Sequence, residues 1–226
     1  MPPTSSTPSP SPTTGPASSR CPDDGTGPVR EALIIDLDGV LRSWAGQRTA
    51  AIERRYGLPA GSLTAVAFAP DRLVPAVTGR TTDAAWRAGV AEELTRRHGA
   101  RGEDAVREWS APVGEVDDDV LAVVRAQRTV RTVALLSNAT DRLRSDLRAL
   151  SLVEEFDAVF SSAELGVAKP DPEVFVRVCA ALGRAPEQCL FVDDSAEHVA
   201  AAAALGLRAH HYRSVAGLSD FLDRWS

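Results

Sequence analysis

The chain has 226 residues, enough to bury a substantial core as one domain or as one domain with an insertion. Its 31 acidic residues outnumber the 25 basic ones, and the resulting net charge of -6 argues against nucleic acid or anionic membrane surfaces as general partners. No apolar run approaches the roughly 20 residues that a transmembrane helix needs, so we expect no membrane span.

Residues 1–28 are rich in Pro, Ser, Thr and Gly and contain almost no hydrophobic residues. Such a segment cannot bury enough apolar surface to offset the entropy of ordering it, and it lacks the basic start and apolar centre of a signal peptide. We therefore predict a disordered tail. The three cysteines, Cys21, Cys179 and Cys189, have no paired spacing, which favours a reducing, cytoplasmic compartment.

Short apolar runs alternate with segments of helical periodicity from about Val29 onward. Strands are predicted at Ala32–Asp36, Thr132–Ser137, Ala158–Ser161, Cys189–Asp193 and Leu207–Tyr212. Helices are predicted between the later strands, at Asp141–Leu150, Pro172–Leu182 and Ala196–Leu205. This alternation predicts an α/β fold with a parallel, three-layer, Rossmann-like sheet.

The segment between the first two predicted strands has helical patterns only, clearest at Thr49–Tyr56, Thr82–Arg97 and Glu103–Trp109. It is too long for a single crossover connection, so we predict a helical cap over the edge of the sheet. The predicted cap is residues 47–112, and the predicted core is residues 29–46 and 113–226. Three residues suit hinge or boundary positions between them: Gly46, Pro112 and Gly114.

Two carboxylates, Asp36 and Asp38, come at the end of the first predicted strand, followed by Gly39. Side chains at positions i and i+2 of a strand point the same way, so both are expected at the carboxyl edge of the sheet. Open α/β folds bind their ligands at that edge. The same residues also suit an ordinary acidic turn, and this pattern alone does not decide between the two interpretations.

Two further predicted strands end in polar residues. Ser137 and Asn138 precede a helix, where a hydroxyl and free backbone N–H groups can hold a phosphate, although a simple helix cap explains them equally well. Asp193 and Asp194 follow an apolar run, and adjacent carboxylates there repel one another unless a cation is near. Mg2+ prefers such oxygen ligands, whereas the alternative is an acidic helix start.

Lys169 is the only lysine in the chain, because every other basic position is arginine. A general preference for arginine explains the depletion, and the position that kept lysine suits a compact ammonium better than a guanidinium fork. The residue lies in a loop ahead of a helix and is followed by Pro170. Chance survival of one surface lysine is the alternative interpretation.

Four segments, taken together and in this order, resemble the four sequence motifs of the haloacid dehalogenase-like (HAD) hydrolases: Asp36-Leu37-Asp38-Gly39-Val40, Ser137-Asn138, Lys169-Pro170 and Asp193-Asp194-Ser195. The resemblance extends from Leu33 to Phe221 and is to subfamily IA, whose helical C1 cap follows the first motif. It implies a Mg2+-dependent phosphatase that acts on a small phosphorylated metabolite through an aspartyl phosphate.

The resemblance also implies roles for individual residues. Asp36 would be the nucleophile, and Asp38 the general acid and base. Phosphate binding would fall to Ser137, Asn138 and Lys169, and Mg2+ binding to Asp36, Asp38 and Asp194, with Asp193 as a ligand or a supporting partner. Four residues are candidates for a substrate pocket, since arginines bind anions and tryptophans stack: Arg42, Trp44, Arg80 and Trp86.

Asp38 bears on the type of reaction. Relatives that displace halide from carbon lack a second aspartate at this position, since halide leaves without a proton, so Asp38 implies an oxygen leaving group. A phosphomutase, a dehalogenase on the same scaffold and a non-catalytic regulatory protein that binds phosphate or a metabolite stay open as alternatives. We expect a monomer or homodimer, and we expect His198 on an exposed helix face.

Overall fold

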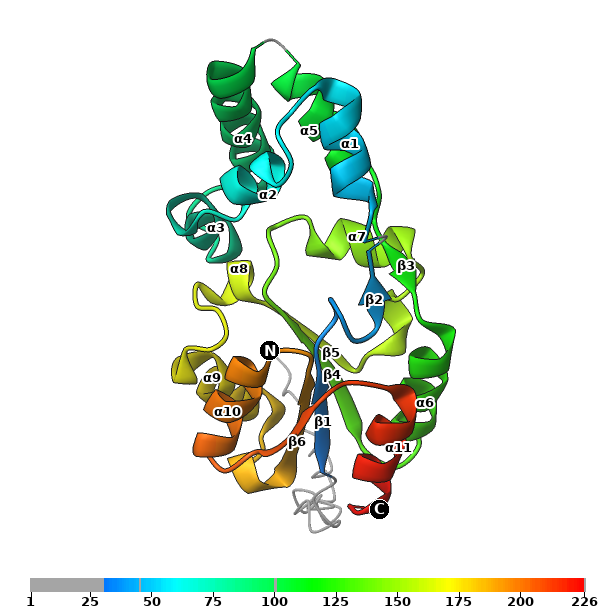
Figure 1. The fold of residues 1–226 in the computed structure, drawn as a ribbon. Helices are drawn as coiled ribbons and strands as arrows, with labels where there is room; N and C mark the ends of the chain where they lie inside the picture. Colours follow the sequence, from blue (N-terminus) through cyan, green and yellow to red (C-terminus); the bar gives the residue numbers. More distant parts are fainter. Residues whose placement is uncertain (1–30, 45, 100, 226) are drawn as a thin grey trace, which may run out of the picture.

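The computed structural model describes residues 31–44, 46–99 and 101–225 (Figure 1), so the predicted tail lies outside the described residues. Within them, the main sheet has five strands in the order β5-β4-β1-β6-β7, and every neighbouring pair is parallel. The strands are β1 (Ala32–Ile35), β4 (Thr132–Ser137), β5 (Ala158–Ser161), β6 (Cys189–Asp193) and β7 (Arg208–His211). The predicted parallel α/β fold is confirmed.

Strand β1 occupies the centre of the sheet, and all four of its residues are fully buried. Burial on both faces explains why its sequence is continuously apolar instead of alternating. In the register, Ile35 is the partner of Leu135 in β4 and of Val192 in β6. The carboxyl ends of these three strands therefore lie at the same edge of the sheet.

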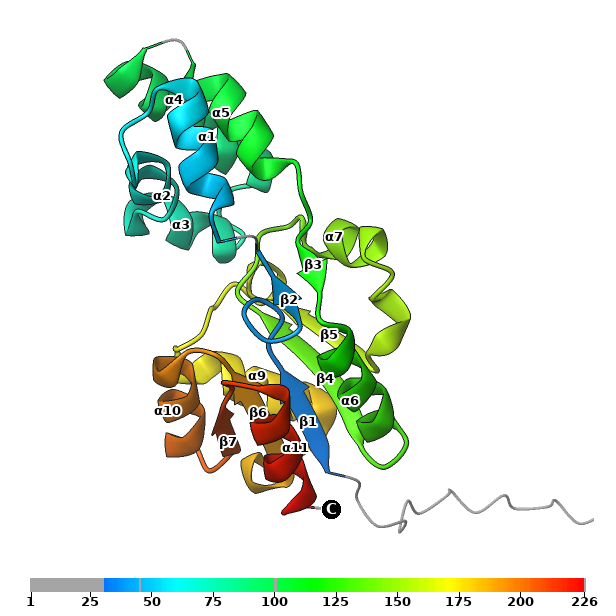
Figure 2. The ribbon, with the colours of Figure 1, turned by 45° about the vertical axis from the view of Figure 1, so that its right-hand side comes forward.

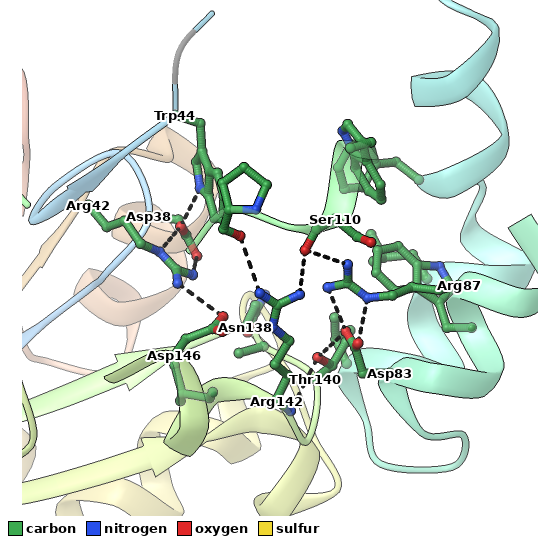
Figure 3. Close-up of a pocket in the computed structure, with 18 of the residues that line it drawn as sticks. Asp38, Arg42, Trp44, Asp83, Arg87, Ser110, Asn138, Thr140, Arg142 and Asp146 are labelled. Carbon is green, nitrogen blue, oxygen red and sulfur yellow. Dashed lines mark hydrogen bonds and ion pairs between the residues drawn. The ribbon is translucent and has the colours of Figure 1, made fainter. Parts of the chain in front are cut away.

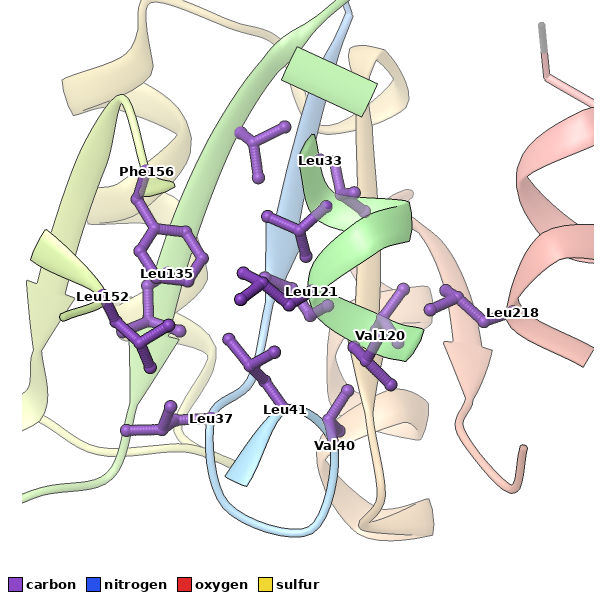
Figure 4. Packing of buried hydrophobic residues seen from close by; sticks show 14 of the residues in the cluster. Leu33, Leu37, Val40, Leu41, Val120, Leu121, Leu135, Leu152, Phe156 and Leu218 are labelled. Atoms are coloured by element: carbon purple, nitrogen blue, oxygen red, sulfur yellow. The ribbon is translucent and has the colours of Figure 1, made fainter. Parts of the chain in front are cut away.

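Helices cover both faces of the sheet and enclose two apolar clusters. One face is covered by α9 (Pro172–Leu182) and α10 (Ala196–Ala204). The other is covered by α6 (Asp118–Arg128), α7 (Leu143–Ala149) and α11 (Val215–Asp223). Figure 4 shows Val120 and Leu121 of α6 and Leu218 of α11 in this second cluster. Shorter pieces are α8 (Ser162–Leu165) and the 3-10 turns Val153–Glu155 and Pro186–Gln188.

A second group of helices stands beyond the carboxyl edge of the sheet (Figures 1 and 2). It comprises α1 (Arg48–Tyr56), α2 (Ser62–Ala67), α3 (Pro70–Val77), α4 (Asp83–His98) and α5 (Gly102–Ser110), which share an apolar core of their own. The antiparallel pair β2 (Arg42–Ser43) and β3 (Glu115–Val116) carries the chain into and out of the group. That this helical group is a cap with boundaries at residues 47 and 112 stays a prediction.

Local sequence signals set the ends of the longer helices. Thr82 caps α4 by accepting a hydrogen bond from the Ala85 N–H, and basic residues fill its last turn. Asp171 caps α9 in the same way, and Gly183 ends that helix in the left-handed conformation. Among the described residues, no helix is long and apolar enough to cross a membrane.

Candidate active site

Three carboxylates and one ammonium group meet at the carboxyl edge of the sheet. Oxygen atoms of Asp36, Asp193 and Asp194 lie within 4.8 Å of one another. The Lys169 Nζ atom lies 2.8 Å from Asp36 Oδ1 and 2.6 Å from Asp193 Oδ2. The register of β1 and β6 and the loop before α9 thus bring together residues that are up to 158 positions apart in the sequence.

Lys169 is buried and fully engaged, which rules out the interpretation of a chance surface lysine. Besides the two carboxylates, its Nζ donates to the Leu136 carbonyl oxygen at 3.1 Å, so its three N–H groups have three acceptors. The Asn138 side chain binds the backbone of Lys169 at two points. It donates to the Lys169 carbonyl oxygen at 2.7 Å and accepts from the Lys169 N–H at 2.9 Å. A planar guanidinium has more donors and a larger head than this site accommodates.

The negative charges of the site outnumber the positive ones. The pKa of Asp36 is raised to about 6, because burial and the neighbouring Asp193 together outweigh the lowering effect of Lys169. Burial, followed by repulsion from Asp193, also raises the pKa of Asp194. Burial lowers the pKa of Lys169, but the two buried carboxylates outweigh it and hold that pKa above its usual value. One ammonium shared among three carboxylates leaves a deficit of positive charge.

His198 supports Asp193, although we expected it on an exposed helix face. It is half-buried in the first turn of α10, and its Nδ1 lies 3.0 Å from Asp193 Oδ1. Burial alone would raise the pKa of Asp193, yet hydrogen bonds from His198, Lys169 and the Ser195 N–H hold it below its usual range. The expectation failed because helix periodicity does not show which way the first turn faces after a strand end.

The donor set suits Mg2+, which prefers oxygen ligands and tolerates several carboxylates. The approach of Asp194 depends on Gly39, because a Cβ atom built there would lie 2.1 Å from Asp194 Oδ2. Gly39 also has a φ of 82°, a conformation that favours glycine. The residues present therefore fit the cation, and Asp36 and Asp194 are the ones that could hold it.

Asp38 has partners different from those of Asp36. Its carboxylate accepts hydrogen bonds from Arg42 Nε at 2.7 Å, from Arg42 Nη2 at 2.8 Å and from Trp44 Nε1 at 2.7 Å. Arg42 is itself buried and donates onward to Asp146 Oδ2 and to the Val113 carbonyl, each at 3.3 Å. Strand β1 ends at Ile35, one residue earlier than predicted, so both aspartates lie in the loop and face separate surroundings.

A cavity of about 470 Å³ lies between the helical group and this edge of the sheet (Figure 3). Of the four candidate pocket residues, Arg42, Trp44 and Trp86 line it, together with Asp38 and Asn138. The fourth, Arg80, is not part of the lining. It lies in the exposed turn after α3, where its Nε donates to Thr78 Oγ1 at 3.1 Å, so the prediction for Arg80 is corrected. A turn beyond a helix end leads the side chain into solvent.

The protein belongs to a class of α/β enzymes that have a Rossmann-like core and a helical insertion. The core carries carboxylates and a lysine at the edge of its sheet, and the helices are inserted after the first strand. A family model described as haloacid dehalogenase-like hydrolase matches residues 31–206. A phosphatase from Mycobacterium tuberculosis (strain CDC 1551 / Oshkosh) is 31% identical over 191 residues, covering 79% of this chain and 85% of that protein. The chain belongs to the haloacid dehalogenase-like hydrolase family.

The chain is also similar to a dehalogenase and to a HAD family enzyme of known structure. An (S)-2-haloacid dehalogenase from Pseudomonas sp. (strain CBS-3) is 38% identical over 76 residues, which is 33% of this chain and 34% of the dehalogenase. Among solved structures, a mutant HAD family enzyme from Bacteroides thetaiotaomicron, in complex with magnesium and inorganic phosphate, has a TM-score of 0.67 and 25% identity. The match covers 81% of this chain and 94% of that one.

Proposed function

We propose that this hydrolase is a Mg2+-dependent phosphatase that cleaves small phosphomonoesters through a covalent intermediate on Asp36. The observation that carries the proposal is the buried Asp36 carboxylate, 2.8 Å from Lys169 Nζ and two residues before Asp38, the second carboxylate, which lines the cavity. An anionic nucleophile can approach an anionic phosphate only where cations offset the repulsion. The proposal is supported by the phosphatase relative and by the magnesium and phosphate bound to the Bacteroides enzyme.

The reaction has two steps that the residues of this chain can carry. In the first, an Asp36 oxygen bonds to phosphorus, the bond from phosphorus to the substrate oxygen breaks, and that oxygen takes a proton from Asp38. In the second, Asp38 takes a proton from water, the water oxygen bonds to phosphorus, and the bond to Asp36 breaks. The products are an alcohol and inorganic phosphate, and both aspartates return to their initial states.

The surrounding residues bind and orient the phosphate. Ser137 and the backbone N–H at Asn138 would hold phosphoryl oxygens at the end of β4, and Lys169 would offset charge on Asp36. Bound Mg2+, held by Asp36, Asp194 and the backbone carbonyl of Asp38, would neutralise charge on the phosphoryl group. Asp193 would keep Lys169 and His198 in place and could contribute an oxygen to the ion.

The dehalogenase alternative is disfavoured by Asp38. A halide leaves as a stable anion and needs no proton, whereas an alkoxide needs one, and Asp38 lies beside the cavity where the leaving group would sit. The short match to the Pseudomonas dehalogenase makes the alternative worth an assay. We expect phosphate release from phosphomonoesters and no halide release from 2-chloropropionate.

Two substitutions test the roles of the aspartates. Asp36→Asn should abolish turnover of 4-nitrophenyl phosphate, and Asp38→Asn should slow an alkyl phosphate far more than 4-nitrophenyl phosphate, because nitrophenolate leaves without a proton. Asp223→Asn, an exposed position on α11, is the matched control and should retain full activity. Full activity of Asp36→Asn, or equal losses for both substrates in Asp38→Asn, would contradict the proposed mechanism.

A further inference from the structure

The size of the cavity bears on which alcohol the phosphate carries. At roughly 30 Å³ of liquid per water molecule, about 470 Å³ corresponds to about sixteen waters. This volume lies within the range of sites that bury most of a drug-sized ligand. A three-carbon alcohol would occupy only a small part of the space and would leave its walls in contact with water.

The wall contributed by the helical group is apolar and aromatic. The Trp109 ring packs edge-to-face against Phe68 and Trp86, with centroids 6.0 Å and 5.9 Å away. Leu73 and Val77, both from α3, extend this wall. Phe68 remains 48% exposed despite its aromatic neighbour, and an exposed large apolar side chain that lines a cavity is typical of a binding site.

A further aromatic ring lies at the reacting end of the cavity. The Trp44 side chain is 47% exposed, and its indole N–H is bonded to Asp38 Oδ1 at 2.7 Å. This bond fixes the ring beside the carboxylate that would protonate the leaving oxygen. An aromatic or apolar group attached to that oxygen would therefore meet Trp44 first and then the wall around Phe68.

The cations that line the cavity are largely neutralised by partners within the protein (Figure 3). Arg87 donates to both oxygens of Asp83 and to the Ser110 carbonyl. Arg142 donates to Asp146 and, at 2.7 Å, to the same Ser110 carbonyl. These guanidinium groups hold the segment that leaves the helical group, so they are not free to bind a second anionic group of a substrate.

Arg42 and Arg48 are the other two arginines of the lining. Arg42 is paired with Asp38 and Asp146. Arg48 donates to the Glu108 carbonyl at 2.6 Å and is the one lining arginine for which the described residues provide no carboxylate partner within ion-pair distance. Three of four guanidinium groups are thus committed, which disfavours substrates that carry a carboxylate or a second phosphate.

We propose that the substrate is the phosphomonoester of a bulky, uncharged, aromatic or apolar alcohol. This inference rests on the proposed phosphatase function and specifies its substrate class. The phosphate lies at the end of β4 beside Asp36, and the apolar group fills the cavity against Phe68, Leu73 and Trp109. Burial of that group excludes water from the reacting centre and strengthens the interactions of the charged groups there.

Three alkyl phosphates test the class without changing the chemistry of the leaving oxygen. We would compare 3-phenylpropyl phosphate, glycerol 3-phosphate and 3-(4-carboxyphenyl)propyl phosphate, all of which release a primary alcohol. The phenylpropyl ester should have a specificity constant, kcat/KM, that exceeds the value for each other substrate by about tenfold or more. Values within threefold of one another, or a preference for the carboxylated substrate, would overturn the proposal and, in the latter case, point to Arg48.

Matched variants locate the selectivity on the proposed wall. Phe68→Ala should reduce the preference for 3-phenylpropyl over glycerol phosphate by about fivefold or more. Val74→Ala removes a side chain of similar exposure, 42%, from the same helical group but outside the lining, and should leave the preference unchanged. Equal effects of both variants would contradict the assignment of the wall.

The two levels of proposal fail in different ways. If the protein releases phosphate from all three substrates at similar rates, and Asp36→Asn abolishes that release, the phosphatase function stands and the substrate class is wrong. If no substrate is hydrolysed in an Asp36-dependent manner, both proposals are wrong. Calorimetric titration of the Asp36→Asn protein with the same phosphates measures the preference without turnover, and it should show the same order.

Discussion

Replacement of Gly39 by alanine should weaken Mg2+ binding without a comparable loss of folding. A Cβ atom at Gly39 would lie 2.1 Å from Asp194 Oδ2, whereas ordinary contact begins at 3.4 Å, so the two groups must separate by about 1.3 Å. Mg2+ binds oxygens at about 2.0–2.1 Å, and sites tolerate deviations of only about 0.2 Å. Displacement by this amount removes Asp194 as a ligand.

The expected magnitude follows from the loss of a well-placed carboxylate. Mg2+ affinity should fall by about 10- to 100-fold, equivalent to about 1.4–2.8 kcal/mol. The matched control is Gly61→Ala, because Gly61 has nearly the same φ, 80° against 82°, and nothing within 4 Å of a built Cβ. Each variant should lose about 1–2 kcal/mol of folding free energy through its backbone conformation, but only Gly39→Ala should lose Mg2+ affinity.

The assay is the Mg2+ concentration that gives half-maximal hydrolysis of 4-nitrophenyl phosphate, together with the increase in Tm on addition of Mg2+. Both report on the ion, and the second needs no turnover. A Gly39→Ala protein that binds Mg2+ within threefold of the wild type would refute the assignment of Asp194 as a ligand. A Gly61→Ala protein with weakened Mg2+ binding would show that the effect arises from general destabilisation.

Three further perturbations probe the charges of the site. Lys169→Met should cost about 3–5 kcal/mol of folding free energy in metal-free protein at pH 8, measured by urea unfolding. The cost should be smaller at pH 5, where Asp36 is largely protonated. The control, Arg177→Met on the exposed surface of α9, should cost under about 1 kcal/mol. The pKa of Asp36 rises from 3.8 to about 6 on folding, so the stability that Asp36 contributes to the metal-free protein is full below about pH 4 and is lost as pH rises through 6. This loss of roughly 3 kcal/mol should be missing in Asp36→Asn. Equal pH profiles of stability for the two proteins would contradict the raised pKa. Asp146→Asn should lower the free energy of unfolding by about 2–3 kcal/mol, because Arg42 and Arg142 both donate to this carboxylate; a loss under about 0.5 kcal/mol would show that the pairs contribute little.

The sheet and the meeting of the motif residues followed from local patterns. Strands β1, β4, β5 and β6 are marked by apolar runs, and parallel strands end at a common edge, so the polar residues at the ends of β1, β4 and β6 converge once the fold is known. The isolated lysine carried information of the same kind. Its Nζ reaches Asp36 and Asp193 because one compact ammonium can serve several acceptors.

Other elements carried weaker signals. Helices α2 and α3 span only 6 and 8 residues, and α3 contains Pro75, so neither gives a long periodic pattern. The environment of Asp38 depends on Asp146, which is 104 positions from the Arg42 that joins them. Arginines are common in this chain, and no local pattern separates a buried one from a solvated one.

The partners of Asp38 correspond to only one half of the proposed reaction. The Asp38 carboxylate accepts two hydrogen bonds from Arg42 and one from Trp44, an arrangement that suits removal of a proton from water. Proton donation to a leaving alkoxide requires that Asp38 exchange Arg42 for the substrate oxygen. Arg42 then still has Asp146 and the Val113 carbonyl, so its charge stays compensated while Asp38 is protonated. Asp146 is therefore needed for the first step more than for the second, and Asp146→Asn should slow alkyl phosphates more than 4-nitrophenyl phosphate.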